Sequence, residues 1–278
     1  MRRALAVIFA CLMASSSWAA LTFPNATDNV DVGSASSIDD VNKGTIIAWV
    51  YRSSNAVGRI WQKGIGASNN QHYFGNSASA VELVIKRTTN CFATSAFGNF
   101  ANDGTSKWLF YAATFDTGGA NGDQKLYIGD LSAVAAVPSS YSTQTVGSGT
   151  VGSDAGDNGF LGNNSASGGH WPGHIAYVQI ISGTLLTSGQ IASMQWRPRM
   201  VAGTVGLWIL GYNGTSTQPD WSGSGNNGTV TGATVVDHPP LGAPWASNGD
   251  PFRWFRGPFT ELVRRFEIPS IREILRLT

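Results

Sequence analysis

Glutamate and cysteine are almost absent from the main part of this chain, and each absence excludes a class of chemistry. Only 2 of the 278 residues are cysteine, and Cys11 lies in the apolar N-terminal segment. Cys91 then has no partner for an internal disulfide, and its apolar neighbours indicate a buried thiol rather than a nucleophile. Glu82 is the only glutamate between residues 20 and 251.

The scarcity of glutamate argues against ordinary sugar hydrolysis. Retaining glycosidases need two carboxyl groups ~5–5.5 Å apart, and no acidic residue lies two to four positions after Glu82. Asp39 and Asp40 are adjacent, so they would point to opposite sides of an extended strand. A lyase that uses His72 with Tyr73, or His170 with Trp171, stays open as an alternative.

Other catalytic and binding motifs are missing as well. The sequence has no Gly-x-Ser-x-Gly elbow, no phosphate-binding loop ending in Gly-Lys-Ser/Thr and no His/Cys cluster suited to zinc. The formal net charge of +1 provides no field that attracts nucleic acid. No apolar run approaches the ~20 residues that a transmembrane span requires.

Glycine is abundant, with 34 residues, and it alternates with Asn, Ser and Thr between short apolar runs. This pattern is typical of many strands joined by polar turns, as in a sandwich or a barrel. The runs 45–51 and 108–116 are apolar on both faces and predict central strands. We also predict strands over 21–31, 80–87 and 174–181, and a short helix that opens near Thr187.

The two ends of the chain differ from this central part. Arg2 and Arg3, an apolar run, and small residues at Ser17 and Ala19 predict a secretory signal peptide over residues 1–19. Cleavage after Ala19 would place the protein outside the cell, in the periplasm or on a cell surface. The alternative is a buried N-terminal element.

The C-terminal end has its own composition. Residues 20–251 carry 10 Lys/Arg and 14 Asp/Glu, whereas residues 252–278 carry 6 Arg and 3 Glu. The composition of residues 237–257 predicts a Pro/Gly/Trp connector. Residues 258–278 are predicted to form an amphipathic helical tail with Leu262 and Phe266 on one face. We expect this tail to pack on its own domain or to mediate self-association; binding to a membrane surface is the weaker alternative.

Several short segments, taken in order, resemble the laminin-G-like, concanavalin A-like jelly-roll domains of lectins and glucanases. The matching residues are Trp49, Lys63-Gly64, Trp108, Asp116, Leu161-Gly162, Trp171, Gly173, Ile175, Leu186-Thr187 and Gln190-Ile191, followed by Asp220 to Ala233. The resemblance implies an all-β, two-sheet antiparallel jelly-roll sandwich over residues 20–236. The last of these segments is N-terminal in many relatives, so here we expect a final strand that closes the sheet beside the first.

Two polar loops with aromatic residues are the candidate ligand sites. A pyranose offers an apolar face and a ring of hydroxyl groups, which aromatic rings and amide side chains bind together. The candidate residues are Asn69, His72, Tyr73, Asn163, Asn164, His170 and Trp171. Each aromatic among them has an alternative role in packing on the rim of the sheets, and Trp171 is as well suited to the core as to a site.

Calcium is the one cofactor that the sequence suggests. Calcium binds carboxylate, amide and carbonyl oxygens on loops, and members of the resembled family often hold it at the rim of the sandwich. The candidate ligands are Asp116, Asp123 and Asp157. The alternative is ordinary turn chemistry, because Asp favours turns for its own reasons.

Three functions follow from this reading. The first is a secreted, non-catalytic carbohydrate-binding or adhesion module whose partner is a glycan. The second is a structural or assembly protein, such as a surface or virion component, that uses the jelly roll as a scaffold. The third is an atypical polysaccharide hydrolase or lyase.

Overall fold

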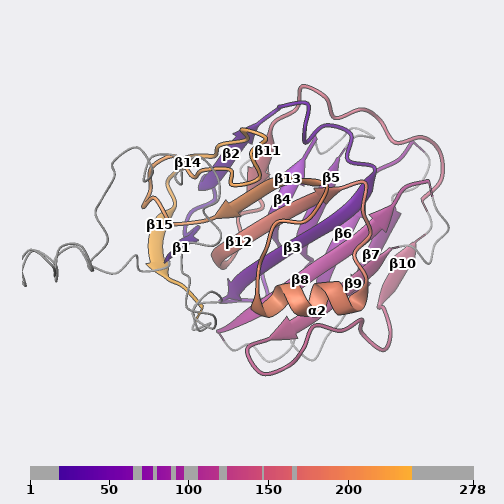
Figure 1. Cartoon of the computed structure of the whole chain (residues 1–278), viewed down its shortest axis with the longest axis horizontal. Helices are drawn as coiled ribbons and strands as arrows, with labels where there is room; N and C mark the ends of the chain where they lie inside the picture. Colours follow the sequence, from indigo (N-terminus) through magenta and orange to yellow (C-terminus); the bar gives the residue numbers. More distant parts are fainter. Residues whose placement is uncertain are drawn as a thin grey trace, which may run out of the picture. The chain divides into compact units, whose positions relative to one another are not determined.

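The computed structural model describes residues 19–64, 71–77, 80–88, 92–96, 106–118, 124–145, 147–164 and 168–239. These residues form two antiparallel sheets that pack face to face, together with one short helix (Figure 1). The predicted jelly-roll sandwich is therefore confirmed. Most of the predicted leader, Cys91, most of the connector and the whole helical tail lie outside the described residues.

The first sheet has the strand order β15-β1-β12-β3-β8-β9, and β13 also pairs with β12. Its longest strands are buried along almost their whole length, because β-branched and aromatic side chains occupy both faces. The predicted central strands 45–51 and 108–116 correspond to β3 and β8. The bounds are β1 (Ala19–Thr22), β3 (Lys43–Arg52), β8 (Lys107–Asp116), β9 (Lys125–Asp130), β12 (Gly173–Ser182), β13 (Thr204–Ile209) and β15 (Thr234–Asp237).

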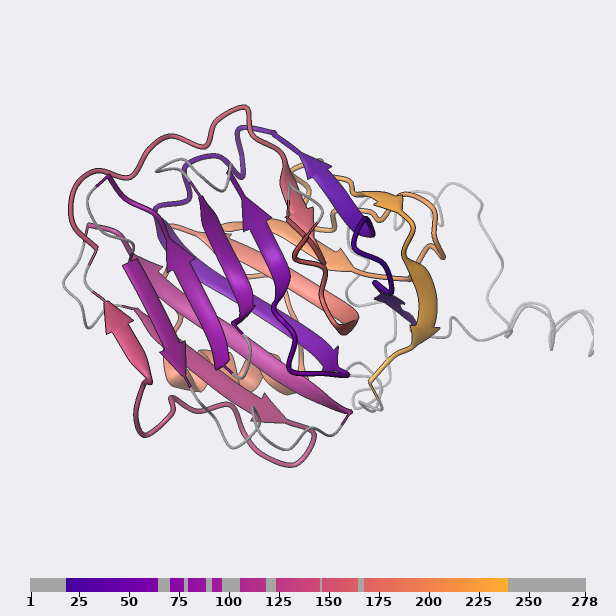
Figure 2. The ribbon, with the colours of Figure 1, turned by 180° about the vertical axis from the view of Figure 1, so that it is seen from behind.

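The second sheet has the order β10-β7-β6-β5-β4-β11-β2-β14 and faces the viewer in Figure 2. Strand β11 contributes only three residues, yet it joins β4 to β2 and so makes the sheet continuous. The bounds are β2 (Asn29–Gly33), β4 (Gly58–Lys63), β5 (His72–Ser77), β6 (Ala80–Ile85), β7 (Phe92–Ala96), β10 (Thr143–Thr145), β11 (Gly159–Leu161) and β14 (Thr229–Thr231).

The segment 21–31, predicted as a single strand, is instead divided between the two sheets. Asp28 accepts a 2.8 Å hydrogen bond from the amide of Asn25, which closes a turn between β1 and β2. The expectation for the end of the chain is confirmed. Strand β14 pairs with β2 and β15 pairs with β1, so the last described strands lie beside the first ones.

The core fills the space between the sheets, and the helix covers the outside of the first one. Helix α2 (Ser188–Trp196) has Thr187 as its N-cap, so it opens where the sequence predicted, and Thr187 forms a capping box with Gln190. The Trp49 indole donates a 2.9 Å hydrogen bond to the carbonyl oxygen of Gln195, which ties α2 to β3. Within the described ranges, no helix has the length and apolarity needed to span a bilayer.

Candidate glycan-binding surface

Two candidate residues of the first predicted loop, His72 and Tyr73, belong to strand β5 instead, and their side chains lie on opposite faces of it. His72 and Tyr73 are adjacent, so their side chains point to opposite faces of the second sheet. His72 points inward and is buried, which lowers its pKa from 6.5 to about 4. Tyr73 is half-buried on the outer face. A lyase pair made of these two residues is therefore split by the sheet, and Asn69 lies outside the described residues.

Two residues of the second predicted loop have structural roles. Trp171 has no exposed surface, and its indole nitrogen donates a 3.0 Å hydrogen bond to the carbonyl oxygen of Tyr51. Asn163 is fully buried and donates to the carbonyl oxygens of Ala26 and Asp28 at 2.7 and 2.9 Å. Both residues shape the loop from inside, where a ligand does not reach them.

Two of the remaining candidates, Tyr73 and Asn164, lie beside Arg59 of β4, and the backbone of His170 lies beside the neighbouring Gly58. The guanidinium carbon of Arg59 lies 3.7 Å from the centre of the Tyr73 ring, in a cation–π contact. The Arg59 amide donates a 2.8 Å hydrogen bond to the carbonyl oxygen of Gly169, the residue before His170. A side chain at Gly169 would press against Asn164, so this loop and Arg59 pack closely.

Arg59 is the centre of this arrangement, although its sequence context gave no sign of it. Its Nη1 atom donates to the carbonyl oxygen of Asn76 at 3.3 Å and lies 3.6 Å from a carboxylate oxygen of Glu82. Both polar contacts use the same nitrogen. Among the described residues, the buried Nε atom has no acceptor. The guanidinium is thus held against the Tyr73 ring by contacts of Nη1.

A row of side chains extends this surface across three strands. Phe160 of β11 lies directly opposite Gln62 of β4, which in turn lies opposite Tyr73 of β5. Because neighbouring strands are ~4.8 Å apart, Phe160 and Tyr73 are roughly 10 Å apart with an amide between them. Both aromatic residues are half-buried. Gln62 is only 1% exposed, so it supports the row from beneath and is not part of the surface. We call the set Arg59, Tyr73, Phe160 and Asn164 the Arg59 surface.

The Arg59 surface combines apolar and polar groups. Two aromatic rings, the Asn164 amide and a guanidinium offer apolar faces and hydrogen-bonding groups side by side. The one carboxylate beside it, Glu82, has Gly75 and Ser95 as its direct cross-strand neighbours. Neither neighbour supplies the second carboxyl group that retaining hydrolysis needs.

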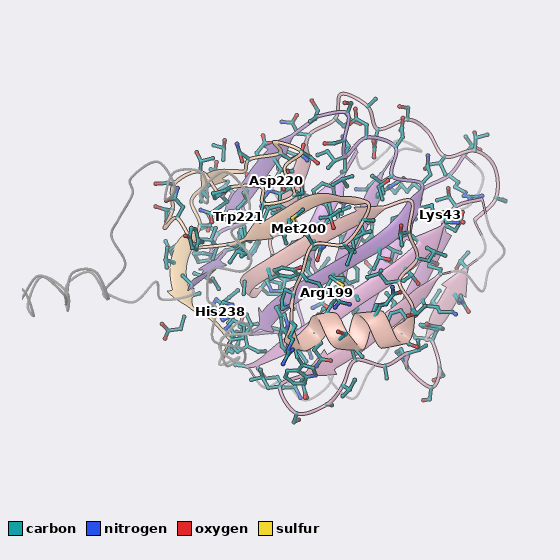
Figure 3. The ribbon with its side chains drawn as sticks, in the orientation of Figure 1. Lys43, Arg199, Met200, Asp220, Trp221 and His238 are labelled. Atoms are coloured by element: carbon teal, nitrogen blue, oxygen red, sulfur yellow. The ribbon has the colours of Figure 1, made fainter. Side chains whose placement is uncertain are left out.

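Two of the three candidate calcium ligands lie in the described part of the chain, and each has a protein partner there. Asp116 makes an ion pair with Lys43, 2.8 Å between Nζ and Oδ2 (Lys43 is labelled in Figure 3), and Asp157 contributes its backbone oxygen to Lys63. Asp123 lies outside the described residues. Within the described part of the chain, no three His, Cys, Asp or Glu side chains are grouped to hold a metal ion.

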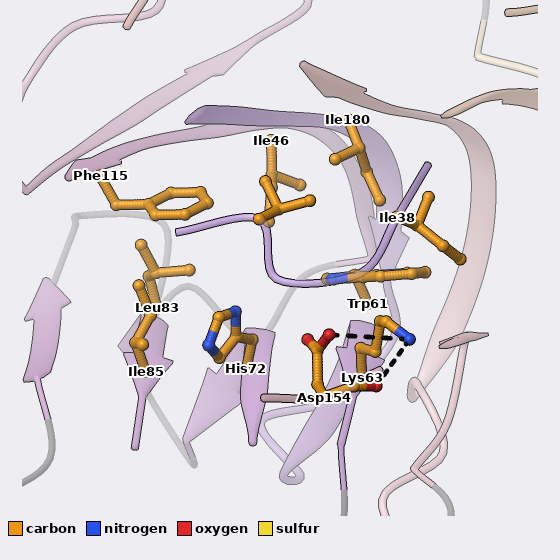
Figure 4. A pocket seen from close by; sticks show the side chains of 11 residues that line it. Ile38, Ile46, Trp61, Lys63, His72, Leu83, Ile85, Phe115, Asp154 and Ile180 are labelled. Carbon is orange, nitrogen blue, oxygen red and sulfur yellow. Dashed lines mark hydrogen bonds and ion pairs between the residues drawn. The ribbon is translucent and has the colours of Figure 1, made fainter. Parts of the chain in front are cut away.

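Between the sheets, sequence reasoning missed a buried charged cluster. Lys63, His72 and Asp154 line a cavity of about 20 Å³ together with apolar residues of both sheets (Figure 4). Such a volume holds about one water molecule and is too small for a sugar. From the sequence alone, a lysine at the end of an apolar strand is expected to be solvated. Nothing near Lys63 indicates that Asp154, about 90 positions away, lies next to it.

Comparison with known proteins finds solved structures of the same fold but assigns the chain to no family. No protein-family model matches the chain, and no curated protein matches it. One solved structure, a Bacteroides ovatus protein described as a "putative carbohydrate binding protein", is 15% identical with a TM-score of 0.55. The match covers 80% of this chain and 60% of that one. The present chain thus spans about three fifths of the length of that relative.

Two further structures are similar at lower scores. Domains LG4-5 of the mouse laminin α1 chain are 14% identical, with a TM-score of 0.41 over 62% of this chain and 44% of that one. A heptameric SAP-like pentraxin from Limulus polyphemus is 12% identical, with a TM-score of 0.42 over 80% and 89% of the two chains. At these identities the comparisons show a common fold and nothing about ligands.

Proposed function

We propose that the protein is a secreted, non-catalytic carbohydrate-binding module that holds a glycan on the Arg59 surface. One observation carries the proposal: residues of strands β4, β5 and β6 and of the loop before β12 meet at Arg59, whose guanidinium stacks on the half-buried Tyr73 ring. Polar donors beside aromatic rings are what a pyranose needs for orientation and for stacking. The function described for the Bacteroides ovatus relative is of the same class.

The geometry favours an extended ligand over a single sugar. Phe160 and Tyr73 lie two strands apart across the sheet, with Gln62 between them. One ring of an oligosaccharide then lies near each aromatic residue, and the buried Gln62 side chain fills the space below them. The internal cavity is too small to hold any part of such a chain.

A glycan array followed by calorimetry tests this proposal. We expect Tyr73→Ala and Phe160→Ala each to weaken binding of the best array ligand roughly tenfold or more, since ~1.4 kcal/mol of lost contact gives that factor. Met200→Ala is the matched control, because Met200 is 48% exposed on the side of the first sheet (Figure 3). It should leave the affinity unchanged.

Two outcomes would contradict the proposal. If no array glycan binds, or if Met200→Ala weakens binding as much as Phe160→Ala does, the Arg59 surface is not the site. Release of reducing ends from a bound polysaccharide, lost in Tyr73→Ala, would show that the surface is catalytic.

A further inference from the structure

Lys63 is enclosed by oxygen atoms at the end of β4. Its side chain is 1% exposed, and Nζ lies 2.6 Å from the carbonyl oxygen of Asp157 and 3.1 Å from that of Asp154. A carboxylate oxygen of Asp39 lies 2.8 Å from Nζ. One of Asp154 lies at 3.8 Å, and this contact is drawn in Figure 4. We call these four oxygens the Lys63 cage.

The Lys63 cage has the oxygen chemistry that a hard cation prefers. Three of its oxygens lie within 3.1 Å of Nζ, and the fourth, on the Asp154 carboxylate, lies at 3.8 Å in a longer ionic contact. The Asp39 oxygen is buried 2.8 Å from Nζ but makes no hydrogen bond, so its contact is ionic and not directional. Two carboxylates also face a single positive charge. Carboxylate and carbonyl oxygens are the ligands that hard cations such as calcium prefer.

The cation in the cage connects segments that are far apart in the chain. Asp39 belongs to the connection between β2 and β3, while Asp154 and Asp157 precede β11. Strand β11 pairs with β4 and β2 through only three residues, so its position depends on the segment that leads into it. The cage therefore controls where β11, and with it Phe160, enters the second sheet.

We infer that the Lys63 amine is a built-in cation that performs the structural role of a bound metal ion. The cage takes up a divalent cation once the amine is removed, because a charge of two balances both carboxylates. In the natural chain the amine already fills the cage, so closure of this end of the sandwich needs no metal.

Chemical rescue tests the inference without any glycan. Lys63→Ala empties the cage, and we expect its thermal midpoint to fall and then to recover when calcium chloride is added, but not with sodium chloride at equal ionic strength. Lys63→Met is the matched control, because it removes the charge while its side chain still fills the space. Its midpoint should fall and should not respond to calcium.

Terbium luminescence gives a direct reading of occupancy. Trp61 lines the same cavity as Lys63, so an ion bound in the cage of Lys63→Ala should be sensitised by indole excitation and displaced by calcium. The natural protein and Lys63→Met should give no such signal. If Lys63→Ala is unfolded when purified, refolding with calcium should restore the fold.

Three results would overturn the inference. They are the failure of calcium to stabilise or refold Lys63→Ala, an equal calcium response of Lys63→Met, and calcium binding by the natural protein at this place.

The effect of the cage on glycan binding, through the position of Phe160, rests on the proposed function and is measured separately. Glycan binding by the natural protein should be insensitive to EDTA, whereas binding by calcium-loaded Lys63→Ala should be lost on chelation. If no glycan binds at all, the proposed function fails, while the rescue and luminescence results still decide the role of Lys63.

Discussion

Asp40 and Asp154 hydrogen-bond to each other reciprocally. The amide of Asp40 donates to the Asp154 carboxylate at 2.7 Å, and the amide of Asp154 donates to the Asp40 carboxylate at 3.0 Å. Asp40 has a φ of 50°, a left-handed conformation that is uncommon for a residue with a side chain. The arrangement places the Asp154 carboxylate inside the protein, where burial raises its pKa from 3.8 to about 6.

Substitution of Asp154 should change how stability depends on pH. A carboxyl group with a raised pKa binds its proton more tightly in the folded chain, so it stabilises the fold at low pH and loses this contribution as the pH rises through about 6. In Asp154→Asn that loss is absent. We expect the free energy of unfolding of the variant, relative to the natural protein, to increase from pH 4 to pH 7. Urea denaturation at several pH values measures it, and parallel profiles would contradict the prediction.

His72 should have the opposite effect. Burial lowers its pKa to about 4, so the neutral ring is favoured in the fold and stability is lost as the pH falls from 6.5 towards 4. The full loss is about 3 kcal/mol, at 1.36 kcal/mol for each pKa unit. His72→Gln should therefore resist acid better than the natural protein in the same urea series. A variant that is equally or more sensitive to acid would show that His72 is not held neutral.

Trp171 should be important for stability and not for direct contact with sugar. Trp171→Phe removes the hydrogen bond to the carbonyl oxygen of Tyr51 and leaves unfilled volume in the core. Together these changes should cost roughly 1–3 kcal/mol of unfolding free energy. Chemical denaturation measures the loss, and calorimetry on the folded variant should show a near-normal glycan affinity. A variant of normal stability with much weaker binding would instead place Trp171 in the site.

Gly75 should accept no larger residue, because two strands touch at this point. A methyl group there would overlap the carbonyl oxygen of Gly58 and come within 3.0 Å of the Arg59 Cα atom. Gly75→Ala should push β4 away from β5, at a cost of roughly 1–3 kcal/mol, and should weaken glycan binding because Arg59 moves off Tyr73. Gly189→Ala is the control, since nothing lies within 4 Å of the added atom. Equal behaviour of the two variants would exclude this packing constraint.

The sequence predicted the parts of the fold that depend on local patterns. The central strands β3 and β8 were found because both of their faces are apolar. Helix α2 was found near Thr187, in the segment whose Leu186-Thr187 and Gln190-Ile191 resemble the jelly-roll family. The division of 21–31 was missed, because the Asp28 turn that breaks it is made by a single side chain in an otherwise extended segment.

The candidate site was predicted only in part, for a physical reason. Composition identifies a loop that is rich in amides and aromatics, but it does not show which side chains turn inward. Trp171 and Asn163 are buried and Tyr73 is not, although all three residues occur in similar polar settings. Arg59 and Lys63 were missed because their roles come from contacts with residues distant in sequence, which strand register and sheet closure create.

Strand β1 lies between β12 and β15, so residues 19–22 gain their second neighbour only when residues 234–237 are present. During synthesis, a ribosome that has exposed the first two hundred residues still presents β1 with one edge open. Completion of this sheet is therefore a late event that follows translation of almost the whole domain. Truncation a few residues before β15 should yield a chain that aggregates through that edge.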